Sequence, residues 1–167
     1  LKILIDSFTI LIFFGKKLPR QGDWVAVGSI VTTFFFAVYL FIQMILEYDP
    51  GFSHGASFSW IDLDAFKIDL GILVDNITII MLLIVTLVSS CSHIFSLKYM
   101  EGDIRYNRYY AYLGLFTFSM NGIVLADNLI SMYMSWELVG VSSYLLIGHW
   151  FEKDSAADAS KKAFLTN

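Results

Sequence analysis

The sequence has little of what soluble enzymes and nucleic-acid-binding proteins depend on. It contains one cysteine, Cys91, which excludes an internal disulfide and any metal or cluster site built from several cysteines. Its 11 Lys and Arg residues against 15 Asp and Glu residues give a net charge of −4, so no basic surface for a nucleic acid is expected. Hydrophobic residues make up 57% of the chain, a composition typical of a membrane protein.

The residue patterns of bond-breaking chemistry are also missing. The three histidines, His54, His93 and His149, fall in different regions of the chain. No nucleophile stands beside a base, no glycine-rich loop could hold a phosphate, and no group of residues has metal-ligand spacing. The sequence therefore predicts no redox or hydrolytic chemistry in this chain itself.

The apolar residues form long blocks separated by short charged segments. A helix needs about 20 residues to cross about 30 Å of hydrocarbon. The pattern predicts an all-α fold, a polytopic transmembrane helix bundle in which residues 1–167 form part of a single membrane domain. Because the chain begins inside one block and stops soon after another starts, it reads as a fragment of a longer protein. The blocks lie at residues 1–14, 24–46, 70–95, 109–126 and 129–150, and a sixth starts within 159–167.

Basic residues gather on one side of the predicted bundle. If all five blocks cross the membrane, the outer loop, residues 47–69, holds only Lys67 among several acidic residues. The loops on the opposite side hold nine basic residues. This asymmetry predicts that the basic side faces inward. The nine are Lys16, Lys17, Arg20, Lys98, Arg105, Arg108, Lys153, Lys161 and Lys162.

Three local signals refine the ends of the blocks. Polar and apolar residues alternate over residues 57–63, which predicts a short strand or hairpin in the outer loop. Asp75 is expected to cap the third helix or favour its dipole, and Asp127 is expected to be the N-cap of the fifth. Aromatic residues near block ends, Tyr110 among them, are expected at the membrane–water interface.

Glu137 lies in the middle of the fifth block. A carboxylate at the centre of a membrane helix is unfavourable by about 2.5–3.5 kcal/mol on insertion scales, so it should face protein or water. At helical spacing it shares a face with small and hydroxyl-bearing residues, a composition that suits helix packing and the lining of a cavity. By default such a carboxylate marks an ion or proton path; the alternative is a structural hydrogen bond to a neighbouring helix. The face consists of Tyr133, Glu137, Gly140, Tyr144 and Gly148.

Two further residues are candidates for a proton path. His93, near the inner end of the third block, is of a residue type that titrates near neutral pH and could feed protons into an aqueous channel, or it could simply bind a loop carbonyl. Lys162, at the start of the sixth block, is either a path residue or an interfacial anchor. Lys153 and Lys161 are expected to be plain anchors.

Several segments together resemble one known family, the chain L or subunit 5 type subunit of proton-pumping NADH:quinone oxidoreductase, respiratory complex I. The likeness extends over most of the chain and identifies it as an N-terminal fragment of such an antiporter-like subunit. One departure is Ser90-Cys91-Ser92, which replaces residues that are usually apolar before the histidine of the third helix. The segments that carry the resemblance include Leu18-Pro-Arg-Gln-Gly-Asp-Trp24, Tyr99-Met-Glu-Gly-Asp-Ile-Arg-Tyr106, Val124-Leu-Ala-Asp-Asn-Leu129, Trp136-Glu-Leu-Val-Gly140 and Lys162-Ala-Phe-Leu-Thr-Asn167.

The resemblance implies a function and a set of partners. Glu137 takes the place of the family's proton-translocating glutamate, whose lysine partner would lie beyond Asn167. Lys162 and His93 match a basic residue and a histidine of the family's channel region. The chain would carry no cofactor, because NADH, FMN, iron–sulfur clusters and quinone belong to partner subunits of the complex. We expect a multi-pass protein of the bacterial plasma membrane rather than the mitochondrial inner membrane.

Two other functions stay open on the sequence. The first is the large subunit of a multisubunit cation/proton antiporter, although Gly140-Val141 and the segment from Lys98 to Asp103 favour the complex I reading. The second is a membrane scaffold that transports nothing and whose Glu137 only holds helices together.

Overall fold

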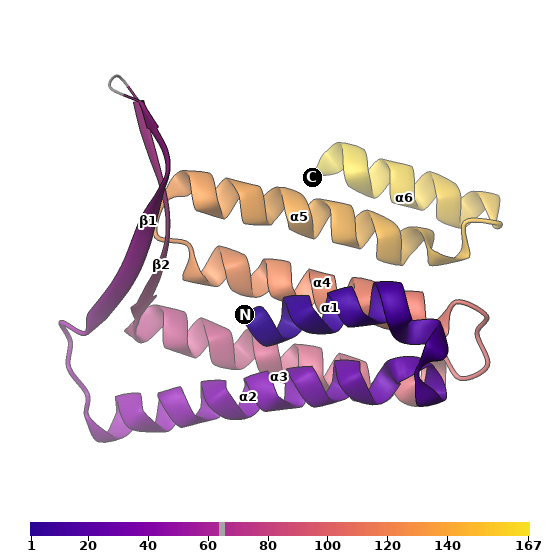
Figure 1. The fold of residues 1–167 in the computed structure, drawn as a ribbon, viewed down its shortest axis with the longest axis horizontal. Helices are drawn as coiled ribbons and strands as arrows, with labels where there is room; N and C mark the ends of the chain where they lie inside the picture. The colour runs from indigo at the N-terminus through magenta and orange to yellow at the C-terminus, as the bar shows by residue number, and fades with distance from the viewer. Residues whose placement is uncertain (64–65) are drawn as a thin grey trace.

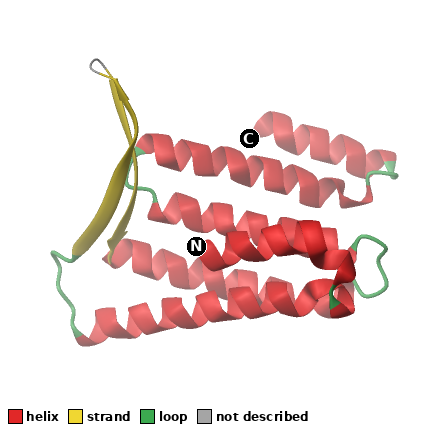
Figure 2. Ribbon diagram, viewed as in Figure 1, coloured by secondary structure: helices red, strands yellow, loops and turns green. Residues whose placement is uncertain are grey.

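Six α-helices lie side by side in the computed structural model, which describes residues 1–63 and 66–167, and a β-hairpin stands across one end of them (Figures 1 and 2). Short 3-10 helices η1, η2 and η3 cover Gly15–Lys17, Pro19–Gly22 and Gly148–Trp150. The longer elements are α1 Lys2–Phe14, α2 Asp23–Leu46, β1 Ser53–Leu63, β2 Phe66–Asp75, α3 Asn76–Tyr99, α4 Tyr106–Leu125, α5 Leu129–Ile147 and α6 Asp154–Thr166.

The two ends of the bundle differ in composition. The loops between α1 and α2, α3 and α4, and α5 and α6 lie at one end (Figure 1). We call it the basic end, because seven of the nine basic residues lie in these loops or within three residues of them. The hairpin and the α4–α5 turn lie at the other, the hairpin end. The chain thus sorts its charges along the bundle as the sequence predicts.

The prediction of an all-α fold is wrong in one respect, because the fold is mostly helical with a long β-hairpin. The third predicted block, residues 70–95, is split: residues 70–75 belong to β2, and α3 runs from Asn76 to Tyr99. An apolar run alone cannot distinguish a strand from a buried helix. Helix α4 begins at Tyr106 rather than at residue 109, and α6 begins at Asp154 rather than at residue 159.

The predicted hairpin in the outer loop is confirmed and is longer than expected. Strands β1 and β2 pair antiparallel from Ser53 opposite Asp75 to Leu63 opposite Phe66, with an irregularity between Ser59 and Ile61. Residues 64–65 of the predicted loop lie outside the described residues. The hairpin contacts the α4–α5 turn through a bridge between Ile72 and Ala126 and a 2.8 Å hydrogen bond from the Asn128 amide to the Asp69 carbonyl oxygen.

The helix caps confirm one prediction and correct another. Asp75 caps α3, because its Oδ1 accepts a 2.7 Å hydrogen bond from the Thr78 N–H. The N-cap of α5 is Asn128, whose Oδ1 accepts from the Ser131 N–H at 2.8 Å, so the prediction for Asp127 is wrong. The cap is the extended residue directly before the helix, and Asp127 stands one position too early, where it accepts from the Asn128 amide.

Removing the Asp75 cap is expected to destabilise the protein measurably. Hydrogen bonding from the Thr78 N–H lowers the pKa of the Asp75 carboxyl. Its stabilising contribution is therefore present above the unfolded-state pKa, about 4, and is lost as the pH falls through the folded-state pKa. We expect Asp75→Ala to lower the free energy of unfolding by about 1 kcal/mol near neutral pH.

The measurement is the midpoint of thermal unfolding of the full-length protein in detergent at several pH values. The matched control is Asp62→Ala, which removes an exposed carboxylate from the same hairpin. An equal loss in both variants would contradict the cap as the cause.

Three helical segments among the described residues are long and apolar enough to cross a membrane: Pro19–Leu46, Asn76–Tyr99 and Leu129–Trp150. Many large apolar side chains on them are exposed, as for Phe35, which is 65% exposed. Such surfaces suit lipid or further membrane helices. The buried hydrophobic cluster lies toward the basic end and includes Leu11, Ala26, Met100, Tyr106, Tyr110 and Ala111.

Candidate functional site

The three residues predicted to form a proton path lie on three different helices. Glu137 is exposed on α5, Lys162 is exposed on α6, and His93 is fully buried on α3. Among the described residues no hydrogen bond or ion pair joins any two of them. Each of the three residues therefore has different neighbours.

Glu137 stands on the predicted stripe of α5, at the point where the contact with α6 ends. Three stripe residues meet α6: Gly140 faces the Asn167 side chain, the Tyr144 ring lies 5.7 Å from that of Phe164, and Gly148 faces Ser160. The inner part of the stripe is thus a helix-packing surface, as the sequence predicts. Glu137 and Tyr133, whose side chains interact, continue the stripe beyond Asn167 and are exposed.

An exposed carboxylate at mid-helix is compatible with a membrane only if another group covers it. In hydrocarbon its charged form would be strongly unfavourable. The Tyr133 hydroxyl supplies one polar contact from the same helix. The stripe therefore presents a polar surface that suits a further helix carrying a hydrogen-bond donor or a cation.

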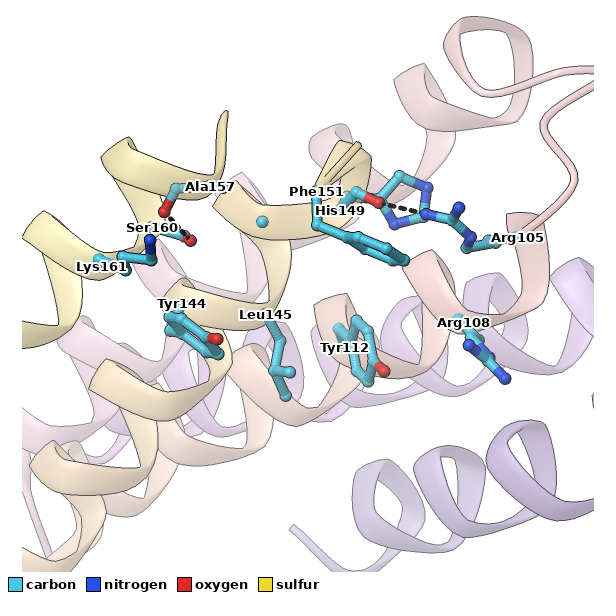
Figure 3. Close-up of a pocket in the computed structure, with 11 residues that line it drawn as sticks. Arg105, Arg108, Tyr112, Tyr144, Leu145, His149, Phe151, Ala157, Ser160 and Lys161 are labelled. Atoms are coloured by element: carbon cyan, nitrogen blue, oxygen red, sulfur yellow. Dashed lines mark hydrogen bonds between the residues drawn. The ribbon is translucent and has the colours of Figure 1, made fainter. Parts of the chain in front are cut away.

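A cavity of about 290 Å³ opens at the basic end between α4, α5 and α6 (Figure 3). Its lining includes Arg105, Arg108 and Lys161, together with the rings of Tyr112 and Tyr144. Lys162 is not among the lining residues, whereas Lys161, expected to be a plain anchor, is. A one-residue shift on a helix turns the side chain by about 100°, so the two lysines point to different surroundings.

The loops next to this cavity are tied together by polar contacts. Arg105 donates to the His149 carbonyl oxygen at 2.9 Å and pairs with Glu152 (Figure 3 shows the first contact). The Asp103 carboxylate accepts from the Trp150 indole at 3.0 Å and from His149 Nε2 at 3.3 Å. Partial burial raises the pKa of the Asp103 carboxyl, but these bonds and one from the Arg105 N–H outweigh it and lower the pKa overall. The α5–α6 hairpin is thereby fixed to the α3–α4 loop.

His93 lies inside the bundle and faces α4. Its Nδ1 donates to the Ser89 carbonyl oxygen at 2.8 Å, so the partner is a carbonyl of its own helix and not of a loop. This bond places the proton on Nδ1 and leaves a lone pair on Nε2. Nε2 is buried and has no partner among the described residues. The His93 ring lies 6.0 Å from the ring of Tyr110.

Buried polar residues that the sequence analysis did not single out surround this histidine. Asp23, at the start of α2, is 3% exposed, and its Oδ2 accepts from the Tyr106 hydroxyl at 3.2 Å. Tyr110, expected near the membrane interface, is fully buried between helices. The available signal was the helical spacing of polar residues on the α3 and α4 faces, but only packing reveals which faces meet. The buried polar residues of the two helices include Thr86, Ser90, Ser96, Asn107, Thr117, Ser119 and Asn121.

No group of three His, Cys, Asp or Glu side chains that could hold a metal ion occurs in the described parts of the chain, residues 1–63 and 66–167. One titratable carboxylate on the α5 stripe and one buried histidine between α3 and α4 are the chemically distinctive members of the site.

Comparison with known proteins places these features in a family. Residues 60–110 match the model described as NADH-ubiquinone oxidoreductase (complex I), chain 5 N-terminus. Residues 126–167 match the model described as NADH:quinone oxidoreductase/Mrp antiporter, transmembrane. The second match contains Glu137.

Curated relatives agree with these models. The chain is 51% identical over 170 residues to the chloroplastic NAD(P)H-quinone oxidoreductase subunit 5 of Anthoceros angustus, covering 98% of this chain and 23% of that protein. It is 42% identical over 171 residues to the NADH-quinone oxidoreductase subunit L of Rickettsia bellii, covering 99% of this chain and 26% of that protein. The chain thus spans about a quarter of the length of these relatives.

A solved structure shares the fold. A chain of the membrane-bound sulfane sulfur reductase, an archaeal respiratory membrane complex, superposes with a TM-score of 0.79 at 15% identity over 98% of this chain and 32% of that one. This likeness supports the architecture alone. The two family models and the curated relatives confirm the resemblance found in the motifs. The chain belongs to the chain L or subunit 5 type of antiporter-like membrane subunits of NADH:quinone oxidoreductases, of which it represents an N-terminal portion.

Proposed function

We propose that the full-length protein is a membrane-arm subunit that translocates protons while NADH is oxidised and quinone reduced elsewhere in the complex. The observation that carries the proposal is the position of Glu137. It is a titratable carboxylate at the middle of α5, on a polar stripe whose inner part already packs a helix. NADH, FMN, iron–sulfur clusters and quinone would belong to partner subunits, and the bacterial plasma membrane is the proposed location.

The proposed mechanism uses a change in the surroundings of Glu137. A lysine on a helix beyond Asn167 would cover the exposed part of the stripe and favour the carboxylate when it is close. When the lysine moves away, desolvation favours the protonated acid. Each pKa unit of change corresponds to about 1.4 kcal/mol, so a few kcal/mol of altered pairing is enough to load and release a proton. Quinone reduction in partner subunits would drive this movement.

The other residues take supporting roles in the proposal. Protons would reach the membrane from the basic end, which the positive-inside rule assigns to the inner side. His93 is proposed as a proton-entry residue. Lys162, in the second half of α6, is proposed as a further residue of the path. Helices α1 to α6 are proposed to cross or enter the membrane.

The test uses inverted membrane vesicles from cells that carry or lack the gene of the full-length protein. We expect NADH-driven acidification of the vesicle lumen to fall when the gene is absent and to return when it is restored. The description of the second matched family also names an antiporter. Acidification that instead responds to an added sodium gradient, with NADH-driven pumping intact, would overturn the proposal in favour of a cation/proton antiporter.

A further inference from the structure

A chain of buried polar groups runs from the basic end into the bundle, on other helices than the one that carries Glu137. It begins at Asp23, whose Oδ2 accepts from Arg20 at 3.0 Å and from the Tyr106 hydroxyl at 3.2 Å. The rings of Tyr106 and Tyr110 lie 5.0 Å apart, and their hydroxyls interact. The Tyr110 hydroxyl in turn donates to the His93 carbonyl oxygen at 3.1 Å. Asp23, the two tyrosines and His93 are at most 9% exposed.

Beyond His93 the same chain continues toward the middle of the bundle. The Ser89 hydroxyl lies 3.4 Å from His93 Nδ1 and forms a short hydrogen bond with the Thr117 hydroxyl. The Asn121 amide donates to the Thr117 carbonyl oxygen at 2.9 Å. From Tyr106 to Asn121 the chain follows α4 for about 22 Å at about 1.5 Å per residue. We call the series Asp23, Tyr106, Tyr110, His93, Ser89, Thr117 and Asn121 the buried polar chain.

Three buried atoms along this series have no hydrogen-bond partner in the described part of the protein: Asp23 Oδ1, His93 Nε2 and Asn121 Oδ1. An unsatisfied buried polar group is unfavourable by about 1–3 kcal/mol. Buried groups of this kind are normally satisfied by internal water molecules. Two of the three are acceptors on proton-binding groups, so water beside them would link the tyrosine hydroxyls to the histidine.

The outer end of the buried polar chain meets solvent at the basic end. A cavity of about 410 Å³ there is lined by Arg20, Asp23, Glu101, Asp103 and Tyr106, among others. Asp23 is the one carboxylate of the three that is buried, at 4% side-chain exposure. It therefore stands between the open cavity and the closed interior, which is where a group that takes protons from solvent would have to stand.

We propose that the buried polar chain, with internal water at Asp23 and His93, is a proton-uptake route into the bundle and that Asp23 is its entry carboxylate. In each transfer a proton binds to one side of a group and another leaves from the opposite side. At His93, Nε2 accepts a proton from internal water, and Nδ1–H leaves its hydrogen bond to the Ser89 carbonyl oxygen and releases its proton to the Ser89 hydroxyl. The Ser89 and Thr117 hydroxyls each release their own proton as they accept one, and the last proton leaves Thr117 to internal water. No atom other than hydrogen changes its bonds. The inference rests on the proposed function, because it supplies protons to that translocation.

The experiment measures proton uptake by the assembled complex in proteoliposomes, with the full-length subunit carrying Asp23→Asn. The amide keeps the shape and accepts from Tyr106 but cannot take up a proton. We expect the initial rate of proton uptake per assembled complex to fall by about tenfold. This loss is smaller than the roughly 10²–10⁴-fold loss typical of a removed proton-transfer group, because neighbouring water can partly replace the carboxylate. The matched control is Glu101→Gln, which removes a carboxylate from the same cavity but is exposed and paired only with Lys98.

A second measurement separates proton uptake from packing. In Asp23→Ala, formate, a small diffusible acid, should restore a substantial part of the rate, which a purely structural defect would not allow. A normal rate in Asp23→Asn, or a loss that formate does not restore, would overturn the inference. If the Asp23 variants do not assemble, Tyr106→Phe decides: slow uptake supports the route and normal uptake contradicts it. Glu137→Gln in the same preparation separates the two proposals. If Glu137→Gln fails to pump while Asp23→Asn pumps normally, only the uptake route is excluded and the proposed function stands.

Discussion

Replacing Glu137 by glutamine is expected to reduce proton translocation by the assembled oxidoreductase by at least about tenfold, since a positioned proton-transfer group contributes about 10²–10⁴. Glutamine keeps the size of the side chain and can still bind the Tyr133 hydroxyl, so packing along the stripe should survive. What it loses is the ability to bind and release a proton. The measurement is the ratio of protons translocated to NADH oxidised in proteoliposomes.

The control for this prediction is Glu47→Gln. Glu47 follows the last residue of α2 at the hairpin end and is exposed, so its loss removes the same charge from a place without a proposed role. We expect the control to pump normally. Normal pumping by Glu137→Gln would show that the carboxylate is not needed for translocation. A loss of pumping that is explained entirely by failure of the complex to assemble would favour a structural role for Glu137.

Replacing Gly22 by valine is expected to prevent correct packing of the basic end. Gly22 joins η2 to α2 with a φ of 79°, where a side chain is strained by about 1–3 kcal/mol. A Cβ atom there would also lie 2.7 Å from Leu11 Cδ2 in the buried cluster, and such overpacking adds about 1–3 kcal/mol. Together these terms are a large part of the stability of a typical domain.

The matched control is Gly28→Ala on α2. A Cβ atom at Gly28 meets nothing within 4 Å, and alanine in a helix interior is favoured over glycine by about 0.5–1 kcal/mol. We therefore expect little assembled complex with Gly22→Val and an undiminished yield with Gly28→Ala, measured by native gel electrophoresis of solubilised membranes. Equal yields would contradict the strained turn.

The sequence predicted the helical bundle because apolar blocks and sorted charges depend on local composition. It failed where two elements share one apolar run. Residues 70–75 are as hydrophobic as the helix that follows, so only pairing with β1 shows that they form a strand. The prediction of the α5 N-cap failed for a similar reason. Asp127 and Asn128 are both suitable caps, and the backbone conformation of Asn128 decides between them.

The candidate site was predictable in part. A carboxylate within an apolar helix is conspicuous by itself, and the spacing of Gly140, Tyr144 and Gly148 indicated the surface that α6 covers. The buried polar chain was not predictable, because its members come from α2, α3 and α4 and meet only after packing. Asp23 in particular reads as an ordinary acidic residue near a basic loop until its 3% exposure is known.

The central claim is that Glu137 changes its protonation state while the complex works. Infrared difference spectroscopy of the assembled complex, recorded on addition of NADH and quinone, tests it most directly, because a protonated carboxylic acid has a carbonyl stretching band that a carboxylate lacks. We predict a carboxylic acid band that appears or disappears during turnover and is absent in Glu137→Gln. A difference spectrum in the carboxylic acid region that is identical in the two proteins would contradict the claim.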